Sequence, residues 1–208
     1  MTKLEQIPYT DRGTALTGWL ARPAASPRAA IAVFPTIMNI TPFVEAKALA
    51  LAEAGYLAFV ADFFGHQPQN FSEASAAAEI TRADPVYRTR LLAALSTLEE
   101  LAPGVRQAAI GFCMGGQAVL ELARADADLA MVASFHGILE TTQPAAKSIR
   151  PRILVCHGGR CARPAQPRAG LLGGNGRGKG RLAFPQLCRG AARFHQPKPV
   201  ADDRRDCL

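Results

Sequence analysis

The chain has 208 residues, of which 49% are hydrophobic, and this suits one compact domain with a sizeable core. No apolar run approaches the roughly 18 residues that a membrane span needs, and Met1 to Glu5 lacks the apolar stretch of a secretory signal. These features exclude a membrane-spanning or exported protein, so we expect a cytoplasmic one. Five cysteines without paired spacing then predict free thiols rather than disulfides.

The net charge of +7 is distributed unevenly along the chain. The first 157 residues have a balance of −1, whereas the rest has +8 and holds 9 of the 18 glycines. No carboxylate lies between Glu140 and Asp202. We therefore predict a folded domain at residues 1–158, followed by an atypical, disordered basic tail at residues 159–208.

The domain alternates between strand and helix patterns. Residues 7–22 alternate apolar and polar side chains around Asp11-Arg12-Gly13, which predicts an N-terminal β-hairpin. Short apolar runs predict buried strands, and Ala- and Leu-rich stretches predict helices. The strands are expected at residues 30–34, 56–60, 107–112, 129–135 and 152–157, and the helices at 43–54, 72–82, 86–101 and 117–124. Asp84-Pro85 separates the second and third helices, with the proline expected in a first turn, and Gly55 caps the first helix.

This alternation predicts a mainly parallel sheet with helices on both faces, an α/β fold. In such sheets the chemistry takes place at the carboxyl ends of the strands. Cys113, the loop at Thr36 and Ile37 and the loop after His157 are all expected at that edge.

A Gly-x-Cys-x-Gly pattern occupies residues 111–116 (GFCMGG), between a predicted strand and a predicted helix. This is the pattern of a nucleophile elbow, in which a sharp turn exposes the nucleophile and glycines avoid collisions with the neighbouring elements. The N-terminus of a helix also favours the thiolate form of a cysteine. We therefore predict that Cys113 is a nucleophile for acyl transfer. The alternative is a buried cysteine in a glycine-rich turn.

An acyl-transfer site needs N–H donors for the oxyanion that forms during the attack. One is expected from Met114, the residue after the nucleophile. The second is expected from Ile37, in the loop after the strand at residues 30–34.

Five short motifs follow one another along the domain: Gly55-Tyr56, Ala61-Asp62-Phe63-Phe64-Gly65, Ile110 to Gly116, Ser134-Phe135-His136-Gly137 and Ile153 to Gly158. In order and spacing they resemble the dienelactone hydrolase family of α/β-hydrolases. The resemblance implies the α/β-hydrolase fold and a Cys-His-Asp triad. It also implies hydrolysis of a lactone or small ester through a thioester on Cys113, without metal or cofactor.

The resemblance also suggests residues that contact the substrate. The family commonly has a glutamate after the first buried strand, where it helps to control the thiol, and this sequence has Thr36 there. Arg82, Arg88 and Arg90 lie on helices that are near the site in the family, where one of them can bind a substrate carboxylate. We expect Thr36, Arg82 and Arg88 in the substrate site; solvated helix positions are the alternative for the arginines.

The acid and base of the triad are not recognisable in this chain. In the family the acid follows the motif that ends at Gly158, and the histidine lies nearer the C-terminus, yet the corresponding region has no Asp or Glu. His195 lies at about the right distance along the chain from Cys113 to act as the base. The alternative is a solvated histidine in the tail.

A shift of reading frame can account for the tail. Read one base later, codons for residues 159–165 can encode Ala-Asp-Ala-Leu-Val-Pro, and those for residues 182–197 can encode Trp-His-Phe and then His-Gly-Phe-Thr-Asn. Both strings resemble the family's missing acid and histidine segments. Our hypothesis is that a frameshift replaced the last quarter of the domain, and codons incompatible with these strings would contradict it.

Three other interpretations of the tail are weaker. Residues 173–180 approach a phosphate-binding loop but end in glycine where Ser or Thr should hold magnesium. The spacing of Cys156, His157, Cys161, Cys188 and His195 fits no common zinc site, so we expect no metal. The tail is basic but has too few aromatic residues for a nucleic-acid stacking surface.

The sequence thus predicts a cytoplasmic hydrolase of the dienelactone hydrolase family with a small lactone or ester substrate. We expect no cofactor, no nucleic acid or membrane partner, and a monomer or weak homo-oligomer. The alternative is a catalytically impaired remnant, or a binding protein that keeps the fold without turnover.

Overall fold

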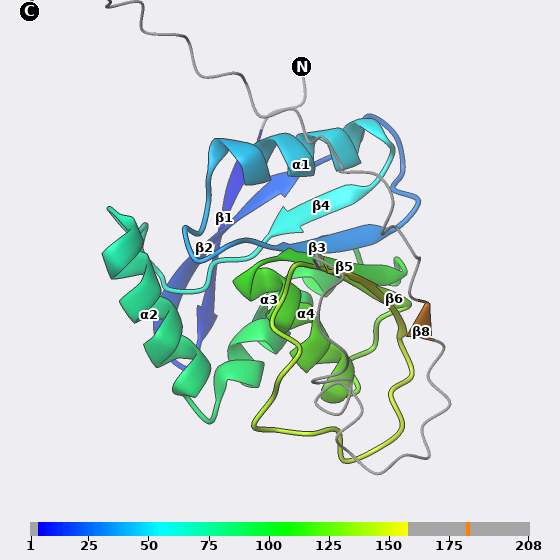
Figure 1. The fold of residues 1–208 in the computed structure, drawn as a ribbon. Helices are drawn as coiled ribbons and strands as arrows, with labels where there is room; N and C mark the ends of the chain where they lie inside the picture. Colours follow the sequence, from blue (N-terminus) through cyan, green and yellow to red (C-terminus); the bar gives the residue numbers. More distant parts are fainter. Residues whose placement is uncertain (1–3, 158–181, 184–208) are drawn as a thin grey trace, which may run out of the picture.

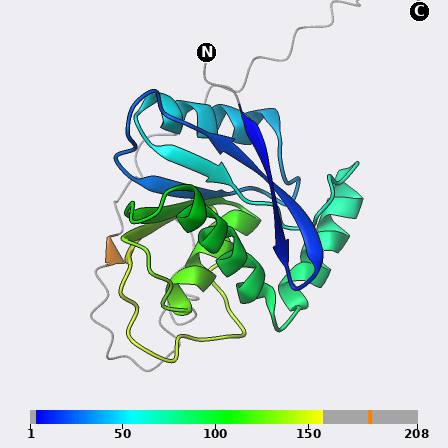
Figure 2. The same ribbon diagram turned by 180° about the vertical axis from the view of Figure 1, so that it is seen from behind.

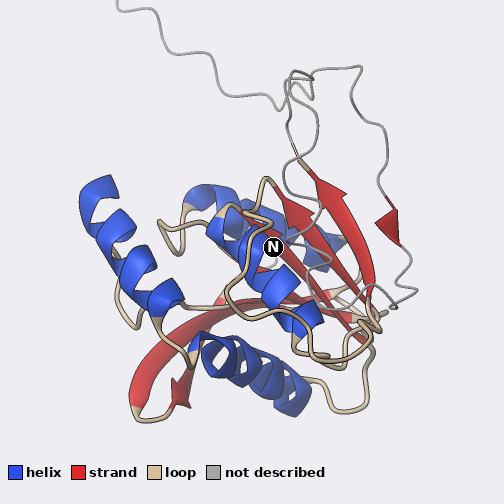
Figure 3. Ribbon diagram, turned by 60° about the horizontal axis from the view of Figure 1, so that its bottom comes forward, coloured by secondary structure: helices blue, strands red, loops and turns tan. Residues whose placement is uncertain are grey.

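The computed structural model describes residues 4–157 and 182–183. Within them one sheet of eight strands has the order β1-β2-β4-β3-β5-β6-β7-β8, with helices on both sides (Figures 1 and 3). The strands are β1 (Glu5–Asp11), β2 (Thr14–Ala21), β3 (Ala30–Phe34), β4 (Leu57–Val60), β5 (Gln107–Phe112), β6 (Met131–Phe135), β7 (Arg152–Cys156) and β8 (Leu182–Ala183). The helices are α1 (Pro42–Glu53), α2 (Phe71–Ala83), α3 (Tyr87–Leu101) and α4 (Met114–Arg124).

The sheet is antiparallel at one end and parallel elsewhere. β1 and β2 form the predicted hairpin, and Arg12 (φ 49°) and Gly13 (φ 84°) provide the left-handed conformations of a two-residue turn. β2 also pairs antiparallel with β4, whereas the six strands from β4 to β8 in the sheet order run parallel to one another. The prediction of a mainly parallel sheet is confirmed.

The central strand β3 is apolar on both faces because both faces are covered. Ala32 and Phe34 pack in the cluster that contains α3 and α4, whereas Ile31 and Val33 pack in the cluster that contains α1. Figures 1 and 2 show α1 on one side of the sheet and α3 and α4 on the other. Full burial of a side chain such as Phe34 contributes about 1.5–3 kcal/mol, so these two clusters fix the layers that position the carboxyl edge.

The helix ends agree with their sequence signals. Thr41 caps α1 by accepting a hydrogen bond from the Val44 N–H at 3.4 Å, and Gly55 follows the helix with φ +88°. Asn70 caps α2 by accepting from the Glu73 N–H at 3.0 Å. No helix among the described residues has the length and apolar character needed to cross a membrane.

Replacing Asn70 by alanine is expected to lower the free energy of unfolding by about 1 kcal/mol. The change leaves the Glu73 N–H without its side-chain acceptor at the start of α2. Urea denaturation measures the effect. No change in stability would show that water replaces the cap without cost.

Two sequence expectations are wrong in detail. Pro85 does not lie in the first turn of α3, because the helix begins at Tyr87 with Val86 as its N-cap. Within the predicted tail, Leu182–Ala183 pairs with β7 as the short strand β8. The rest of the tail, including His195, lies outside the described residues. α4 also begins at Met114 rather than Gln117, since its two glycines are helical and not part of a loop.

Candidate active site

Cys113 occupies the turn between β5 and α4 in a strained conformation. Its φ and ψ are 55° and −113°, a region in which a residue other than glycine costs about 1–3 kcal/mol. Two backbone hydrogen bonds hold this turn: the Cys113 N–H donates to Phe135 O at 3.0 Å, and its carbonyl accepts from the Gln117 N–H at 3.2 Å. The half-buried thiol therefore sits at the head of a helix, as expected for a nucleophile elbow.

The glycines of the elbow allow three backbone segments to approach closely. A Cβ atom on Gly111 would lie 1.9 Å from Gly115 O, and one on Gly115 would lie 2.0 Å from Phe34 O. Both obstacles are backbone atoms, which cannot rotate away. The pattern in the sequence thus reflects the packing of the start of α4 against the ends of β5 and β3.

The loop after β3 lies beside the nucleophile. β3 and β5 are neighbours, with Phe34 opposite Gly111, and the Gly115 N–H donates to Pro35 O at 2.9 Å. Ile37 follows two residues after this contact. No hydrogen bond within residues 4–157 engages the N–H of Ile37 or of Met114, the first residue of α4. The two predicted oxyanion donors are therefore on adjacent backbone segments at the carboxyl edge of the sheet.

Comparison with known proteins identifies the family. The model of the dienelactone hydrolase family matches residues 16–167, which is more than half of the chain. The chain belongs to the dienelactone hydrolase family. It therefore has the α/β-hydrolase fold, as the strand order and the elbow indicated.

Individual relatives agree with this membership. A probable 2-oxo-3-(5-oxofuran-2-ylidene)propanoate lactonase from a Bradyrhizobium species is 32% identical over 66% of this chain. The chain spans only 57% of the length of that relative. A solved structure called m3DLH is 31% identical with a TM-score of 0.74, covering 88% of this chain and 81% of the other. A dienelactone hydrolase-like promiscuous phosphotriesterase from metagenomic libraries is 33% identical with a TM-score of 0.69, covering 76% and 70%.

The three arginines that the family resemblance singled out differ in their contacts. Arg88 is bound to the Glu121 carboxylate, with Nη2 to Oε2 at 2.6 Å, and Arg90 donates to Asp11 and to Phe63 O. Arg82 donates from Nε to Ala78 O at 3.2 Å, and no ion pair within residues 4–157 engages it. Of the three, Arg82 therefore has the guanidinium best able to bind an anion.

A buried tyrosine lies close to Arg82. Burial raises the pKa of the Tyr87 hydroxyl, the negative charge of Glu121 raises it further, and Arg82 lowers it. This hydroxyl has no hydrogen-bond partner among the described residues. Tyr87 could not be predicted as a site residue, because its position in the first turn of an amphipathic helix gives no signal beyond core packing.

Two groups of hydrogen-bonded polar residues were also missed. Asn39, in the loop that carries Ile37, is bonded to Asp62 in the loop after β4, and Glu121 of α4 links Arg88 of α3 to Arg124 at the end of α4. A carboxylate in the apolar run of α4 and an aspartate directly after a buried strand were the available signals. Their partners come from distant parts of the chain, so the sequence alone could not pair them.

The histidines and cysteines do not complete a triad within the described residues. His136 is exposed with φ 44°, and its N–H donates to Cys156 O at 2.8 Å. No three His, Cys, Asp or Glu side chains in the described part of the chain are grouped to hold a metal.

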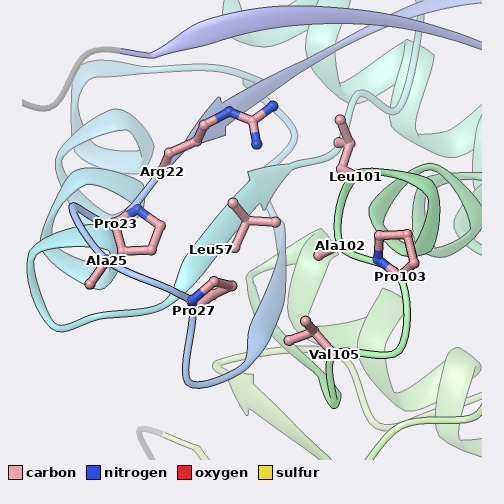
Figure 4. Close-up of a pocket in the computed structure, with 9 residues that line it drawn as sticks. All are labelled: Arg22, Pro23, Ala25, Pro27, Leu57, Leu101, Ala102, Pro103 and Val105. Atoms are coloured by element: carbon pink, nitrogen blue, oxygen red, sulfur yellow. The ribbon is translucent and has the colours of Figure 1, made fainter.

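A cavity of about 300 Å³ lies at the opposite edge of the sheet (Figure 4). Arg22 and Pro27 after β2, Leu57 at the start of β4, and Leu101 and Val105 between α3 and β5 line it. Because β4 begins at this cavity while Cys113 follows the end of β5, the cavity is not part of the elbow site.

Proposed function

We propose that this chain is a hydrolase of lactones or small carboxylic esters that acts through a thioester on Cys113. The observation that carries the proposal is the strained backbone of Cys113 at the head of α4, beside the loop of Pro35 to Ile37. Membership of the dienelactone hydrolase family and the similarity to a lactonase support the substrate class.

The chemistry follows from these positions. The Cys113 thiolate attacks the ester carbonyl carbon, a C–S bond forms, and the carbonyl oxygen takes the negative charge. The N–H groups of Ile37 and Met114 stabilise this oxyanion. The C–O bond then breaks, and the alkoxide leaves with a proton or, in a lactone, remains attached to the acyl group. Water hydrolyses the thioester in the second half of the reaction, which needs a base.

The other proposed roles rest on the same site. Arg82 binds a carboxylate of the substrate at the end of α2, supported by its lack of an ion pair among residues 4–157. Thr36 and Arg88 line the substrate site. His195 is the proposed base, and we keep the frameshift hypothesis for the tail after the incomplete domain at residues 1–158. The proposed protein is cytoplasmic and a monomer or weak homo-oligomer, with a small molecule as its partner.

Intact-mass measurement with p-nitrophenyl acetate tests the proposal. We expect one acetyl group on Cys113 together with release of p-nitrophenolate, and a loss of both in Cys113→Ala. Cys156→Ser is the matched control, because Cys156 is also a half-buried free cysteine but lies at the end of β7. Equal labelling of the wild type and Cys113→Ala would overturn the proposal.

The fate of the acetyl group separates turnover from impairment. Loss of the acetyl mass with time, and further rounds of phenolate release, indicate a working hydrolase. A thioester that persists indicates the second candidate, a remnant that is acylated but lacks a base for hydrolysis. The absence of a recognisable Asp and His in the family positions favours testing this outcome directly.

A further inference from the structure

Asn39 occupies an unusual position in the loop that carries Ile37. It is 1% exposed and has φ 56°, a left-handed conformation that asparagine tolerates better than most residues. Its N–H donates to Thr36 O at 3.0 Å and closes a turn around Ile37. The Thr36 hydroxyl accepts from the Met38 N–H at 3.2 Å within the same turn. The position of Asn39 therefore sets the position of the Ile37 N–H.

The amide of the Asn39 side chain makes three hydrogen bonds to the loop after β4. Its Nδ2 donates to Asp62 Oδ1 at 2.7 Å and to His66 O at 3.3 Å. Its Oδ1 accepts from the Phe63 N–H at 3.3 Å. These contacts join two loops at the carboxyl edge of the sheet that are separated in the chain by α1 and β4.

Asp62 is a rigid anchor for this amide. Its carboxylate accepts from the N–H groups of Thr17, Phe64 and Gly65, each at 2.9 Å. Its backbone N–H donates to the Tyr9 hydroxyl at 2.9 Å, and the same hydroxyl donates to Asp62 O at 3.1 Å. Asp62 is 4% exposed. The carboxylate is thus held by β2 and its own loop, independently of the turn that contains Ile37.

We propose that Asn39 is a positioning residue that holds the Ile37 N–H in place for the oxyanion, through its bond to Asp62. The inference rests on the proposed function, because it assigns a purpose to the Ile37 donor. A displaced donor stabilises the oxyanion less, and removing one such donor from a hydrolase lowers the rate by about 100- to 1,000-fold. Asn39 does not touch the substrate, so its loss is expected to have a smaller effect than this.

The decisive experiment compares two reactions of the same thiol. Acylation by p-nitrophenyl acetate forms a C–S bond through an oxyanion, whereas alkylation by iodoacetamide forms a C–S bond as the C–I bond breaks, with no oxyanion. Both reactions need the Cys113 thiolate, so a change in the fraction of thiolate alters both rates equally. The ratio of the two rates therefore reports how well the site stabilises the oxyanion. Asn39→Gly keeps the left-handed backbone accessible while it removes the side-chain contacts. We expect the ratio to fall by about 10- to 100-fold in this variant.

A second variant, Asn39→Asp, tests the same role through the pH dependence of the rate ratio. Asn39→Asp keeps the size of the side chain but faces the Asp62 carboxylate with a second one. Burial and the like charge raise the pKa of the new carboxyl. Once protonated, it can donate to Asp62 as the amide does, so the rate ratio of this variant is expected to rise toward the wild-type value as pH falls. A merely structural role would not produce this pH dependence.

Asn70→Ala is the matched control, because it also removes an asparagine side-chain oxygen that accepts a hydrogen bond from a backbone N–H, but at the start of α2. Its ratio is expected to stay within about twofold of wild type. Wild-type ratios in both Asn39 variants would overturn the inference while leaving the proposed function intact. Unfolding of both variants would also contradict it, because Asn39 would then serve the fold as a whole. No acylation of Cys113 in the wild type would overturn both proposals.

Discussion

Gly115→Ala is expected to lower the free energy of unfolding by about 4 kcal/mol or more, a large part of the roughly 5–15 kcal/mol of a typical domain. Two effects of opposite sign compete at this position. Alanine is the better helix former, and in an exposed helix the change would gain about 1 kcal/mol. Here the new Cβ would lie 2.0 Å from Phe34 O and 2.5 Å from Pro35 O. Because both atoms belong to the backbone, α4 must move away from β3, and the collision outweighs the helix propensity.

The same movement separates the two oxyanion donors. The Gly115 N–H bonds Pro35 O, so displacement of α4 moves Met114 away from the loop that carries Ile37. We expect acylation of Cys113 by p-nitrophenyl acetate to fall by about 100-fold or more. Urea denaturation and the phenolate release rate measure the two effects on one sample.

Gly104→Ala is the matched control for the loss of stability. Gly104 has φ +70°, and a Cβ added there would meet no atom within 4 Å. The only cost of alanine at this position is therefore the strain of a left-handed backbone, which lowers the free energy of unfolding by about 1–2 kcal/mol. A Gly115→Ala variant that is as stable as the Gly104→Ala variant would contradict the close packing of α4 against β3.

The elbow could be predicted from the sequence because its cause is local. The strand, the turn and the helix that hold Cys113 lie within about 20 consecutive residues, and the glycines mark where backbone segments must approach. The helix nevertheless begins three residues earlier than expected. Gly115 and Gly116 have low helix propensity, and contacts with β3 and with the loop after β6 overcome that preference.

The polar network around the site could not be predicted because its partners are distant in sequence. Asn39 and Asp62 are 23 residues apart, and Arg88 and Glu121 are 33 residues apart. Periodicity identifies which residues face the core, but it does not indicate which buried charges meet. The family resemblance suggested Arg88 as a substrate contact but gave no indication of its ion pair with Glu121.

The consequence for Glu121 can be measured. Glu121→Gln is expected to lower the free energy of unfolding by about 3–5 kcal/mol, as for other buried ion pairs that lose one partner. The carboxylate accepts from Arg124 at 2.7 Å on one oxygen and from Arg88 at 2.9 and 2.6 Å on the other. Burial lowers the pKa of Arg124 and the charge of Glu121 opposes this. Without that charge, two guanidinium groups face each other in the interior.

Glu5→Gln is the matched control, since it makes the same chemical change in an exposed pair. The Glu5 side chain is 55% exposed and accepts from Arg22 at 3.2 Å, so its loss is expected to cost about 0–1 kcal/mol. Similar losses in the two variants would show that the buried carboxylate contributes no more than a surface one.

A second readout locates the effect of Glu121 in the structure. Arg124 donates to Leu139 O at 2.5 Å and Arg88 donates to Gln143 O, so the two arginines fasten the segment that follows β6. When Glu121 no longer orients them, amide hydrogen exchange in residues 139–143 is expected to accelerate under native conditions, ahead of exchange in β5. Exchange that accelerates equally in both places would mean that Glu121 stabilises the whole domain and does not specifically hold the segment at residues 139–143.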